Sequence, residues 1–188
     1  MKIGLYFGSF NPIHTGHLII ASHIIEHSDL NKIWFVVSPQ NPLKPSSTLL
    51  NEYQRLHLVR LSIENDTRFI VADVEFKLPK PSYTIDTLTH LTEKYPQHQF
   101  TIIMGSDSYS NLHNWKNYEL LTKNYSIIVY TRPRFEVKDN KYAATIVNAP
   151  LLDISSTLIR TNIKAKKSVR YLVHEAVYEE LKNNKYYK

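Results

Sequence analysis

The sequence predicts an α/β fold, a doubly wound Rossmann-like parallel sheet with helices on both faces. The first observation behind this prediction is that short β-rich apolar runs alternate with segments of helical periodicity. The second is that the runs are apolar throughout, as in strands that are buried on both faces of a sheet. The chain has 188 residues, which is an ordinary length for one domain, so we expect a single domain over residues 1–188.

The expected elements follow one another in strand–helix order. Apolar runs of strand length occupy residues 2–7, 32–38, 68–76, 99–106, 125–131 and 144–150, and the run at 68–76 becomes irregular towards its end. Apolar residues recur at helical spacing in 17–28, 52–65 and 82–95, and two C-terminal helices are expected near 155–164 and 169–182. Residues 39–47 are rich in proline, which favours a loop between the second strand and the second helix.

Composition narrows the classes of protein that the chain can represent. It contains no cysteine, which excludes disulfides, thiol catalysis and thiolate metal sites and fits a cytoplasmic protein. No apolar run approaches the roughly 20 residues that span a bilayer, and the N-terminal residues lack the pattern of a secretory signal, so we expect no membrane partner. The formal net charge of +6 favours anionic partners, among them phosphorylated small molecules and nucleic acid. The sequence leaves the oligomeric state open, a homo-oligomer included.

The most unusual stretch is "GSFNPIHTGH", residues 8–17, which follows the first predicted strand. Ligands of open α/β sheets bind beyond the carboxyl ends of the strands, so this loop is a favoured position for a site. Gly8 permits a positive φ and a close backbone approach, and Thr15 is expected to cap a helix that starts near Gly16. Free N–H groups at a helix start attract phosphate, and the imidazoles of His14 and His17 can donate hydrogen bonds to its oxygens.

This stretch resembles the His-x-Gly-His signature of the nucleotidyltransferase superfamily, which holds the phosphates of a nucleoside triphosphate. The resemblance implies that His14 and His17 are catalytic. It also implies that ATP is bound by Gly8, Ser9, Phe10 and Gly16.

A second stretch, "DISSTLIR" at residues 153–160, offers another anion site at a helix start. Ser155 or Ser156 is a natural N-cap, and Arg160, about one turn further on, can bind phosphate with a fork of donors. The stretch resembles the C-terminal signature of bacterial adenylyltransferases, which implies that Ser155, Ser156 and Thr157 bind ATP and that Arg160 acts in catalysis. Lys44, in the loop after the second strand, can reach the phosphates as a point charge.

Two middle stretches bear on the second substrate. In "PSYTIDTL", residues 81–88, Ser82 and Thr84 are candidate N-caps, and the turn offers free N–H groups to a carboxylate. In "MGSDSYSNLHNW", residues 104–115, Gly105 allows close approach, Asp107 can accept hydrogen bonds from ribose hydroxyls and Trp115 offers a flat face to an aromatic ring.

Together the motifs resemble the nicotinate-nucleotide adenylyltransferase family, and the similarity runs from residue 3 to about residue 162. The resemblance implies that the pocket for nicotinate mononucleotide is formed by Asn11, Lys44, Tyr83, Thr84 and Trp115, and that Gly105 and Asp107 contact ATP. The implied reaction is attack of the 5′-phosphate of nicotinate mononucleotide on the α-phosphorus of ATP, with release of pyrophosphate. Mg²⁺ would accompany the ATP phosphates, and no cluster of acidic residues suggests a metal site made by protein alone.

Two other functions stay open at this point. Pantetheine-phosphate adenylyltransferase shares the expected fold and chemistry, but it is not expected to carry the stretches at 81–88 and 104–115. A basic nucleic-acid-binding module would also suit the charge of +6, although the basic residues do not interleave with aromatic residues in a known binding motif.

Overall fold

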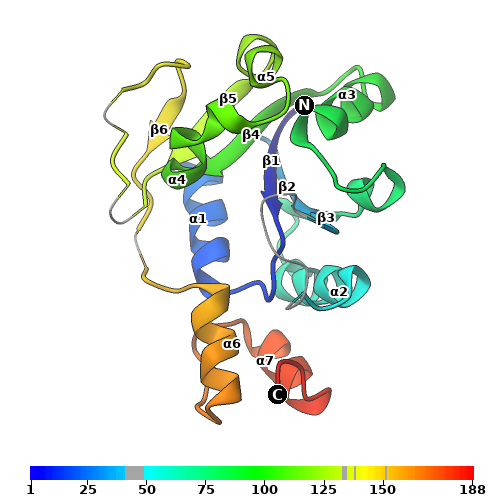
Figure 1. Cartoon of the computed structure of the whole chain (residues 1–188), viewed down its shortest axis with the longest axis vertical. Helices are drawn as coiled ribbons and strands as arrows, with labels where there is room; N and C mark the ends of the chain where they lie inside the picture. Colours follow the sequence, from blue (N-terminus) through cyan, green and yellow to red (C-terminus); the bar gives the residue numbers. More distant parts are fainter. Residues whose placement is uncertain (41–48, 133–134, 138, 151) are drawn as a thin grey trace.

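The computed structural model describes residues 1–40, 49–132, 135–137, 139–150 and 152–188 (Figure 1). Its centre is a six-stranded sheet in the order β3-β2-β1-β4-β5-β6, and every pair of neighbouring strands is parallel. The strands are β1 (Lys2–Gly8), β2 (Lys32–Val37), β3 (Phe69–Ala72), β4 (Gln99–Gly105), β5 (Ser126–Tyr130) and β6 (Thr145–Val147). The predicted doubly wound parallel sheet is therefore confirmed.

Helices connect β1 to β5 in turn, and two further helices follow β6. The α-helices are α1 (Thr15–Glu26), α2 (Glu52–Ile63), α3 (Thr84–Lys94), α4 (Ser106–Ser110), α5 (Tyr118–Asn124), α6 (Ser156–Lys164) and α7 (Glu175–Asn183), and the two 3₁₀ turns are η1 (Val74–Lys77) and η2 (Leu112–Asn114). The irregular end of the 68–76 run is η1. The short helices α4 and α5 and the turn η2 were not predicted, because each is too short to show a full helical period.

The sheet separates two buried apolar clusters, one on each face. Along β1, Leu5 packs into the cluster under α3, α4 and α5, and its neighbour Tyr6 packs into the cluster under α1 and α2. This alternation follows from the two-residue period of a strand. Both faces are covered, which explains why the strand sequences are apolar without alternation.

The cluster on the α1 and α2 face continues past the sheet into the C-terminal helices. Val173, Val177 and Leu181 are buried in the same cluster as Tyr6 and Phe35. Figure 1 shows α6 and α7 together at the lower end of the molecule, beyond the end of the sheet towards which β1 points. The C-terminal segment therefore packs at the edge of the sheet where ligands are expected.

The second C-terminal helix is shorter than the sequence indicated. It begins at Glu175 instead of residue 169, and His174 is its N-cap. The preceding residues form turns, because the backbone carbonyl of Leu172 accepts a hydrogen bond from the N–H of Thr15, 3.0 Å away, at the start of α1. The first N–H groups of a helix have no partner within the helix, and the carbonyl of Leu172 pairs with one of them, that of Thr15.

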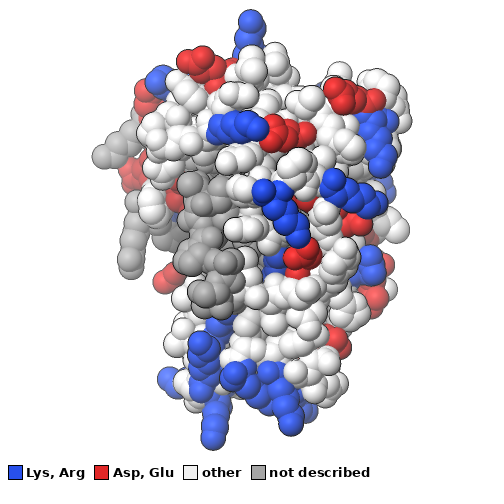
Figure 2. All heavy atoms as spheres, turned by 45° about the vertical axis from the view of Figure 1, so that its right-hand side comes forward, with Lys and Arg blue, Asp and Glu red and all other residues white. Residues whose placement is uncertain are grey.

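Lys and Arg side chains gather at the lower end of the molecule, over the C-terminal helices, on the face that Figure 2 shows. This is where much of the excess positive charge of the sequence lies. Among the described residues, no helix combines the length and the apolar character that crossing a bilayer requires.

Candidate active site

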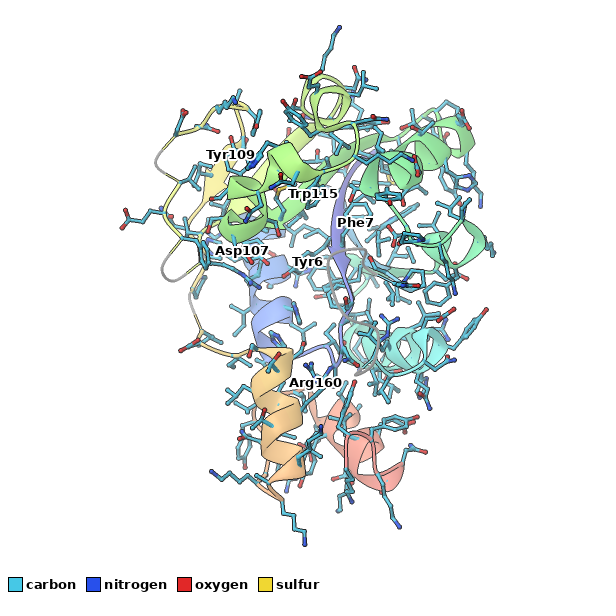
Figure 3. The ribbon with its side chains drawn as sticks, in the orientation of Figure 1. Tyr6, Phe7, Asp107, Tyr109, Trp115 and Arg160 are labelled. Carbon is cyan, nitrogen blue, oxygen red and sulfur yellow. The ribbon has the colours of Figure 1, made fainter. Side chains whose placement is uncertain are left out.

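Those predicted site residues that the structure describes gather around the carboxyl edge of the sheet, near β1 and β4. These neighbouring strands are where the connections diverge to opposite faces, which is the usual ligand position in this architecture. Figure 3 shows Trp115 and Phe7 in the upper half of the molecule, Tyr6 and Asp107 near its middle, and Arg160 below them, so the labelled residues span both sides of this edge.

The loop that follows β1 turns in a way that the sequence did not suggest. Glycine permits a positive φ, but none of the four glycines has one, and Phe10 adopts φ 44° instead. The next peptide, Asn11–Pro12, is cis. Gly8 is required for space rather than for its φ, since a Cβ there would lie 2.7 Å from the ring of Phe10.

The ring of Phe10 belongs to the core. Phe10 is 3% exposed, and its ring meets those of His17 and Phe35 at centroid distances of 5.1 and 5.6 Å. Only the backbone of Phe10 is therefore placed to face a ligand, while its side chain supports the imidazole of His17 from behind.

His14, not Thr15, is the N-cap of α1. Its backbone is extended (φ −145°, ψ 166°), and its N–H lies 3.3 Å from Nδ1 of His17 in a hydrogen bond. The two imidazoles are stacked with centroids 3.7 Å apart. A Cβ on Gly16 would lie 3.1 Å from Nδ1 of His14, so this glycine makes room for the histidine ring.

The environment of His14 sets its protonation. The residue is 6% exposed, and burial lowers its pKa from 6.5 to about 4, with a smaller contribution from the positive charge of Arg132. The imidazole is therefore neutral at pH 7. Its Nδ1 and the hydroxyl of Ser9 are buried without a hydrogen-bond partner among the described residues. Unpaired buried polar atoms are rare, and two in one loop indicate a place where a ligand binds.

The start of α6 is joined directly to this loop. The hydroxyl of Ser155 accepts a hydrogen bond from Leu158 N (3.1 Å), which confirms Ser155 as the N-cap. The hydroxyl of Ser156 donates to the carbonyl of Pro12 at 2.8 Å.

Arg160 makes the second connection between the two motifs. Its Nη1 donates to the carbonyl of Asn11 at 2.8 Å, and its Nη2 donates to Thr157 Oγ1 at 3.2 Å. The structure thus brings together the two helix starts that the sequence singled out separately.

Asp107 lies in the first turn of α4, directly after β4, and forms an ion pair that sequence reasoning missed. Its Oδ2 is 3.0 Å from Nη1 of Arg132, whose backbone N–H donates to the hydroxyl of Ser106 at 2.9 Å. A Cβ on Gly105 would lie 2.5 Å from Asp107 Oδ1. Arg132 follows β5, and the end of that strand was already a favoured position for functional residues.

The stretches at 81–88 and 104–115 meet on the other face of the sheet. Tyr83 and Trp115 are half-buried against the cluster under α3, α4 and α5. Lys116 joins them, because its Nζ lies 4.8 Å from the centre of the Tyr83 ring and 2.8 Å from Asp86 Oδ2.

Neither Ser82 nor Thr84 caps α3, contrary to expectation. The N-cap is Tyr83, and no side chain caps this helix start. Ser82 is turned away because its hydroxyl donates to the carboxylate of Glu75 at 2.6 Å. Thr84 is already the first residue of the helix.

A buried guanidinium, also missed, supports the base of the site. Arg55 on α2 is 0% exposed, although the helix reads from sequence as amphipathic with its charges in solvent. It donates to the carbonyls of Leu50, Ser9, Ser38 and Pro39 at 2.6–3.0 Å. Arg55 therefore ties the ends of β1 and β2 to the start of α2.

Asn11 is held from several sides. Its Oδ1 accepts hydrogen bonds from Leu50 N (3.1 Å) and from the hydroxyl of Tyr187 (2.7 Å), in a C-terminal stretch where the sequence showed no motif. Burial raises the pKa of Tyr187, whereas the guanidiniums of Arg160 and Arg55 lower it. Lys44, predicted for both substrates, lies outside the described residues.

An open parallel sheet with two joined helix starts at its strand switch point defines a nucleotide-binding α/β protein of the nucleotidyltransferase class. The chain belongs to the cytidylyltransferase-like family, whose model matches residues 5–162.

Proteins similar to this chain are known from several organisms. A protein of Flavobacterium psychrophilum is 50% identical over 192 residues that cover 100% of both chains, and one of Cytophaga hutchinsonii is 50% identical over 190 residues, 100% of this chain and 98% of the relative. Both bear the name probable nicotinate-nucleotide adenylyltransferase.

A solved structure shares the fold. It is the nicotinic acid mononucleotide adenylyltransferase of Plasmodium falciparum in complex with NaAD, and it matches 99% of this chain and 97% of its own with a TM-score of 0.84 at 22% identity.

Proposed function

We propose that this protein transfers AMP from ATP to nicotinate mononucleotide, giving deamido-NAD and pyrophosphate. The observation that carries the proposal is the direct joining of the two predicted phosphate-binding helix starts, through Ser156 to Pro12 and Arg160 to Asn11. The names of relatives that are 50% identical over the whole chain support nicotinate mononucleotide as the acceptor. We place the reaction in the cytoplasm, as the composition suggested.

The α1 and α6 side of the sheet edge is assigned to ATP. His14, His17 and the start of α6 surround the loop after β1, and the unpaired atoms of Ser9 and His14 lie in the same loop. The backbone of Gly8, Phe10 and Gly16 lines this side. Gly105 and Asp107 approach from β4, where the carboxylate of Asp107 can accept hydrogen bonds from a ribose while Arg132 holds it.

The α3 side of the same edge is assigned to nicotinate mononucleotide. Tyr83 and Trp115 provide aromatic surface for the pyridine ring, and the first turn of α3, at Thr84, offers N–H groups to its carboxylate. Asn11 lies where the two sides meet, and Lys44 is expected to complete the pocket. Since a neutral amide gains less from a helix start than a carboxylate does, this arrangement favours the acid over nicotinamide mononucleotide.

The proposed chemistry is an in-line displacement. A 5′-phosphate oxygen of the mononucleotide forms a bond to the α-phosphorus of ATP as the bond to the leaving pyrophosphate breaks. The step needs alignment and neutralisation of charge more than a covalent nucleophile. His14 contributes as a neutral donor, since burial lowers its pKa to about 4, while Arg160 and Lys44 contribute full positive charges.

The residues fit a Mg²⁺ ion that arrives with ATP. Within the described part of the chain, no three His, Asp or Glu side chains converge on one point, and the carboxylate at the phosphate side, Asp107, is paired with Arg132. We expect Mg²⁺ to arrive with the phosphates of ATP, since it is commonly bound in proteins together with substrate phosphates and water. When bound, the ion would offset the negative charge of the phosphates.

The proposal is tested by substrate choice. Purified protein is incubated with ATP and Mg²⁺ and, in parallel, with nicotinate mononucleotide, nicotinamide mononucleotide or 4′-phosphopantetheine, and pyrophosphate release is followed. We expect release with nicotinate mononucleotide, at least tenfold less with the amide and none with phosphopantetheine. Activity with phosphopantetheine alone would instead identify a pantetheine-phosphate adenylyltransferase.

A further inference from the structure

Glu75 is a buried carboxylate that the proposed chemistry does not use. It lies in η1 between β3 and α3 and is 2% exposed. Within the described part of the chain, no Lys, Arg or His approaches it closely enough for an ion pair. Burial raises the pKa of its carboxyl group, and hydrogen bonds from Ser82, Ser38 and Thr87 act in the opposite direction. A carboxyl group that is buried without a cation is costly unless its oxygens are hydrogen-bonded, and at Glu75 hydroxyl groups supply these hydrogen bonds.

The three donors come from two segments of the site, the start of α3 and the end of β2. The hydroxyl of Ser82 lies 2.6 Å from Glu75 Oε2 and belongs to the turn before α3, and the hydroxyl of Thr87 lies 2.9 Å from Oε1 on the next turn of that helix. Ser38 directly follows β2. Glu75 thus fixes the start of α3 against the carboxyl edge of the sheet.

The same network reaches Tyr83. Thr87 Oγ1 is also 3.3 Å from the carbonyl of Tyr83, the N-cap of α3. Ser82, the residue before the N-cap, is drawn towards Glu75 and away from the helix start, which has no side-chain cap. Glu75 is therefore hydrogen-bonded to residues on both sides of Tyr83 in the sequence, Ser82 and Thr87.

We propose that Glu75 is a positioning residue for the mononucleotide: it holds the turn 81–84 in the shape that receives the nicotinate carboxylate and keeps the hydroxyl of Ser82 from capping α3. This inference rests on the proposed function. Glu75 itself does not touch the substrate in this assignment.

The experiment compares Glu75→Gln and Thr87→Val with a matched variant, Thr87→Ser, which keeps the hydroxyl. We expect Glu75→Gln and Thr87→Val to raise KM for nicotinate mononucleotide about tenfold and to change KM for ATP less than twofold, because the ATP side does not use this network. Thr87→Ser should keep the wild-type KM. Ile63 lies in the core cluster on the α1 and α2 face of the sheet, away from Glu75, so Ile63→Val serves as a control for loss of stability alone.

Hydrogen exchange at the amides of 82–87 supplies a readout that does not depend on turnover. We expect faster exchange there in Glu75→Gln and Thr87→Val than in wild type, with no such change in Ile63→Val. An unchanged KM for the mononucleotide in Glu75→Gln and Thr87→Val would overturn the proposal. Equal rises in KM for the mononucleotide and for ATP would also overturn it, if Ile63→Val shows the same rises at the same loss of Tm. If wild-type protein released no pyrophosphate with nicotinate mononucleotide, the proposed function would be wrong. The positioning role is tested separately, because unchanged hydrogen exchange at 82–87 in Glu75→Gln and Thr87→Val would refute it.

Discussion

The two histidines at the start of α1 differ in their surroundings. His14 is enclosed by its stacked neighbour, by Gly16 and by the chain behind it, so its ring stays neutral over the physiological pH range. His17 stands one turn further on, between the ring of Phe10 and that of His14. Identical side chains three residues apart therefore occupy different surroundings.

The lowered pKa of His14 predicts a pH dependence of stability. Below pH 6.5 the unfolded chain takes up a proton on this imidazole that the folded protein does not bind until about pH 4. The free energy of unfolding should therefore fall by up to about 3 kcal/mol as pH falls from 6.5 to 4. Denaturant titration of wild type and His14→Asn at several pH values checks this, since asparagine is neutral and an acceptable N-cap. Parallel pH curves for the two proteins would contradict it.

For His17, substitution tests catalysis. His17→Ala should lower kcat by roughly 10²–10³-fold, the usual cost of losing one donor to developing charge, with little change in Tm. Pyrophosphate release at saturating substrates measures it. His23→Ala, on the same helix but away from the loop, is the control and should keep wild-type turnover. Near-normal turnover of the His17 variant would remove this residue from the reaction.

At the scale of elements, α6 is the part of the site that bridges two motifs far apart in sequence. Ser155 caps the helix by accepting a hydrogen bond from Leu158 N. Ser156 and Arg160 instead donate hydrogen bonds to backbone carbonyls of the loop after β1. The helix therefore contacts that loop directly, and we propose that its own N-terminus also binds an anion.

Arg160 should act mainly on the triphosphate. We expect Arg160→Ala to raise KM for ATP and for pyrophosphate in the reverse reaction by about tenfold or more, because a forked charge-assisted contact is lost. Arg160→Lys should restore only part of this, since lysine lacks the fork. Lys164→Ala, one turn further along α6 and exposed, is the matched control. Unchanged pyrophosphorolysis in Arg160→Ala would show that the guanidinium serves the fold alone.

The sequence was sufficient for the elements that local pattern encodes. Six strands, the main helices and a serine cap at residue 155 or 156 were all readable, because apolar runs and capping residues act over a few positions. The cap at His14 was not, since it depends on the fit of two rings, and α7 began later than its periodicity suggested because Leu172 is engaged by Thr15. Local sequence patterns do not predict the end of a helix where a hydrogen bond from a distant segment competes with those of the helix.

The residues of the site that were missed share one property. Arg55, Glu75 and Arg132 are charged residues whose partners lie on other segments, so nothing in their own neighbourhood distinguishes them from solvated side chains. Arg55 makes the point most clearly, because it is fully buried on a helix that reads as amphipathic. Only the assembled fold shows that its partners are backbone carbonyls.

At the scale of the whole molecule, the carboxyl edge of the sheet is closed by the C-terminal segment. Thr15 is bound by Leu172, Asn11 by Tyr187, and the valines of this segment share a core cluster with Tyr6. The segment that carried no recognisable motif thus supports the loop that carries the most distinctive one.

Tyr187 permits a test of this support. Tyr187→Phe removes one hydrogen bond to Asn11, worth about 1 kcal/mol, and should raise KM for nicotinate mononucleotide roughly fivefold while leaving kcat nearly unchanged. Steady-state kinetics with each substrate varied in turn provide the measurement. Tyr171→Phe, at a tyrosine that is 87% exposed, should behave as wild type. Equal kinetics in the two variants would show that the contact does not matter for binding.

The bond between Thr15 and Leu172 also has a consequence for how the molecule comes into being. Synthesis runs from the N-terminus, so the loop after β1 is made before Leu172, with more than a hundred residues between the two. A nascent chain in which all six strands have emerged still lacks the groups that support the loop after β1. These are the carbonyl of Leu172, the buried valines of the C-terminal segment and the phenol of Tyr187. We therefore expect the loop after β1 to reach its final shape only after Leu172 and Tyr187 have been made.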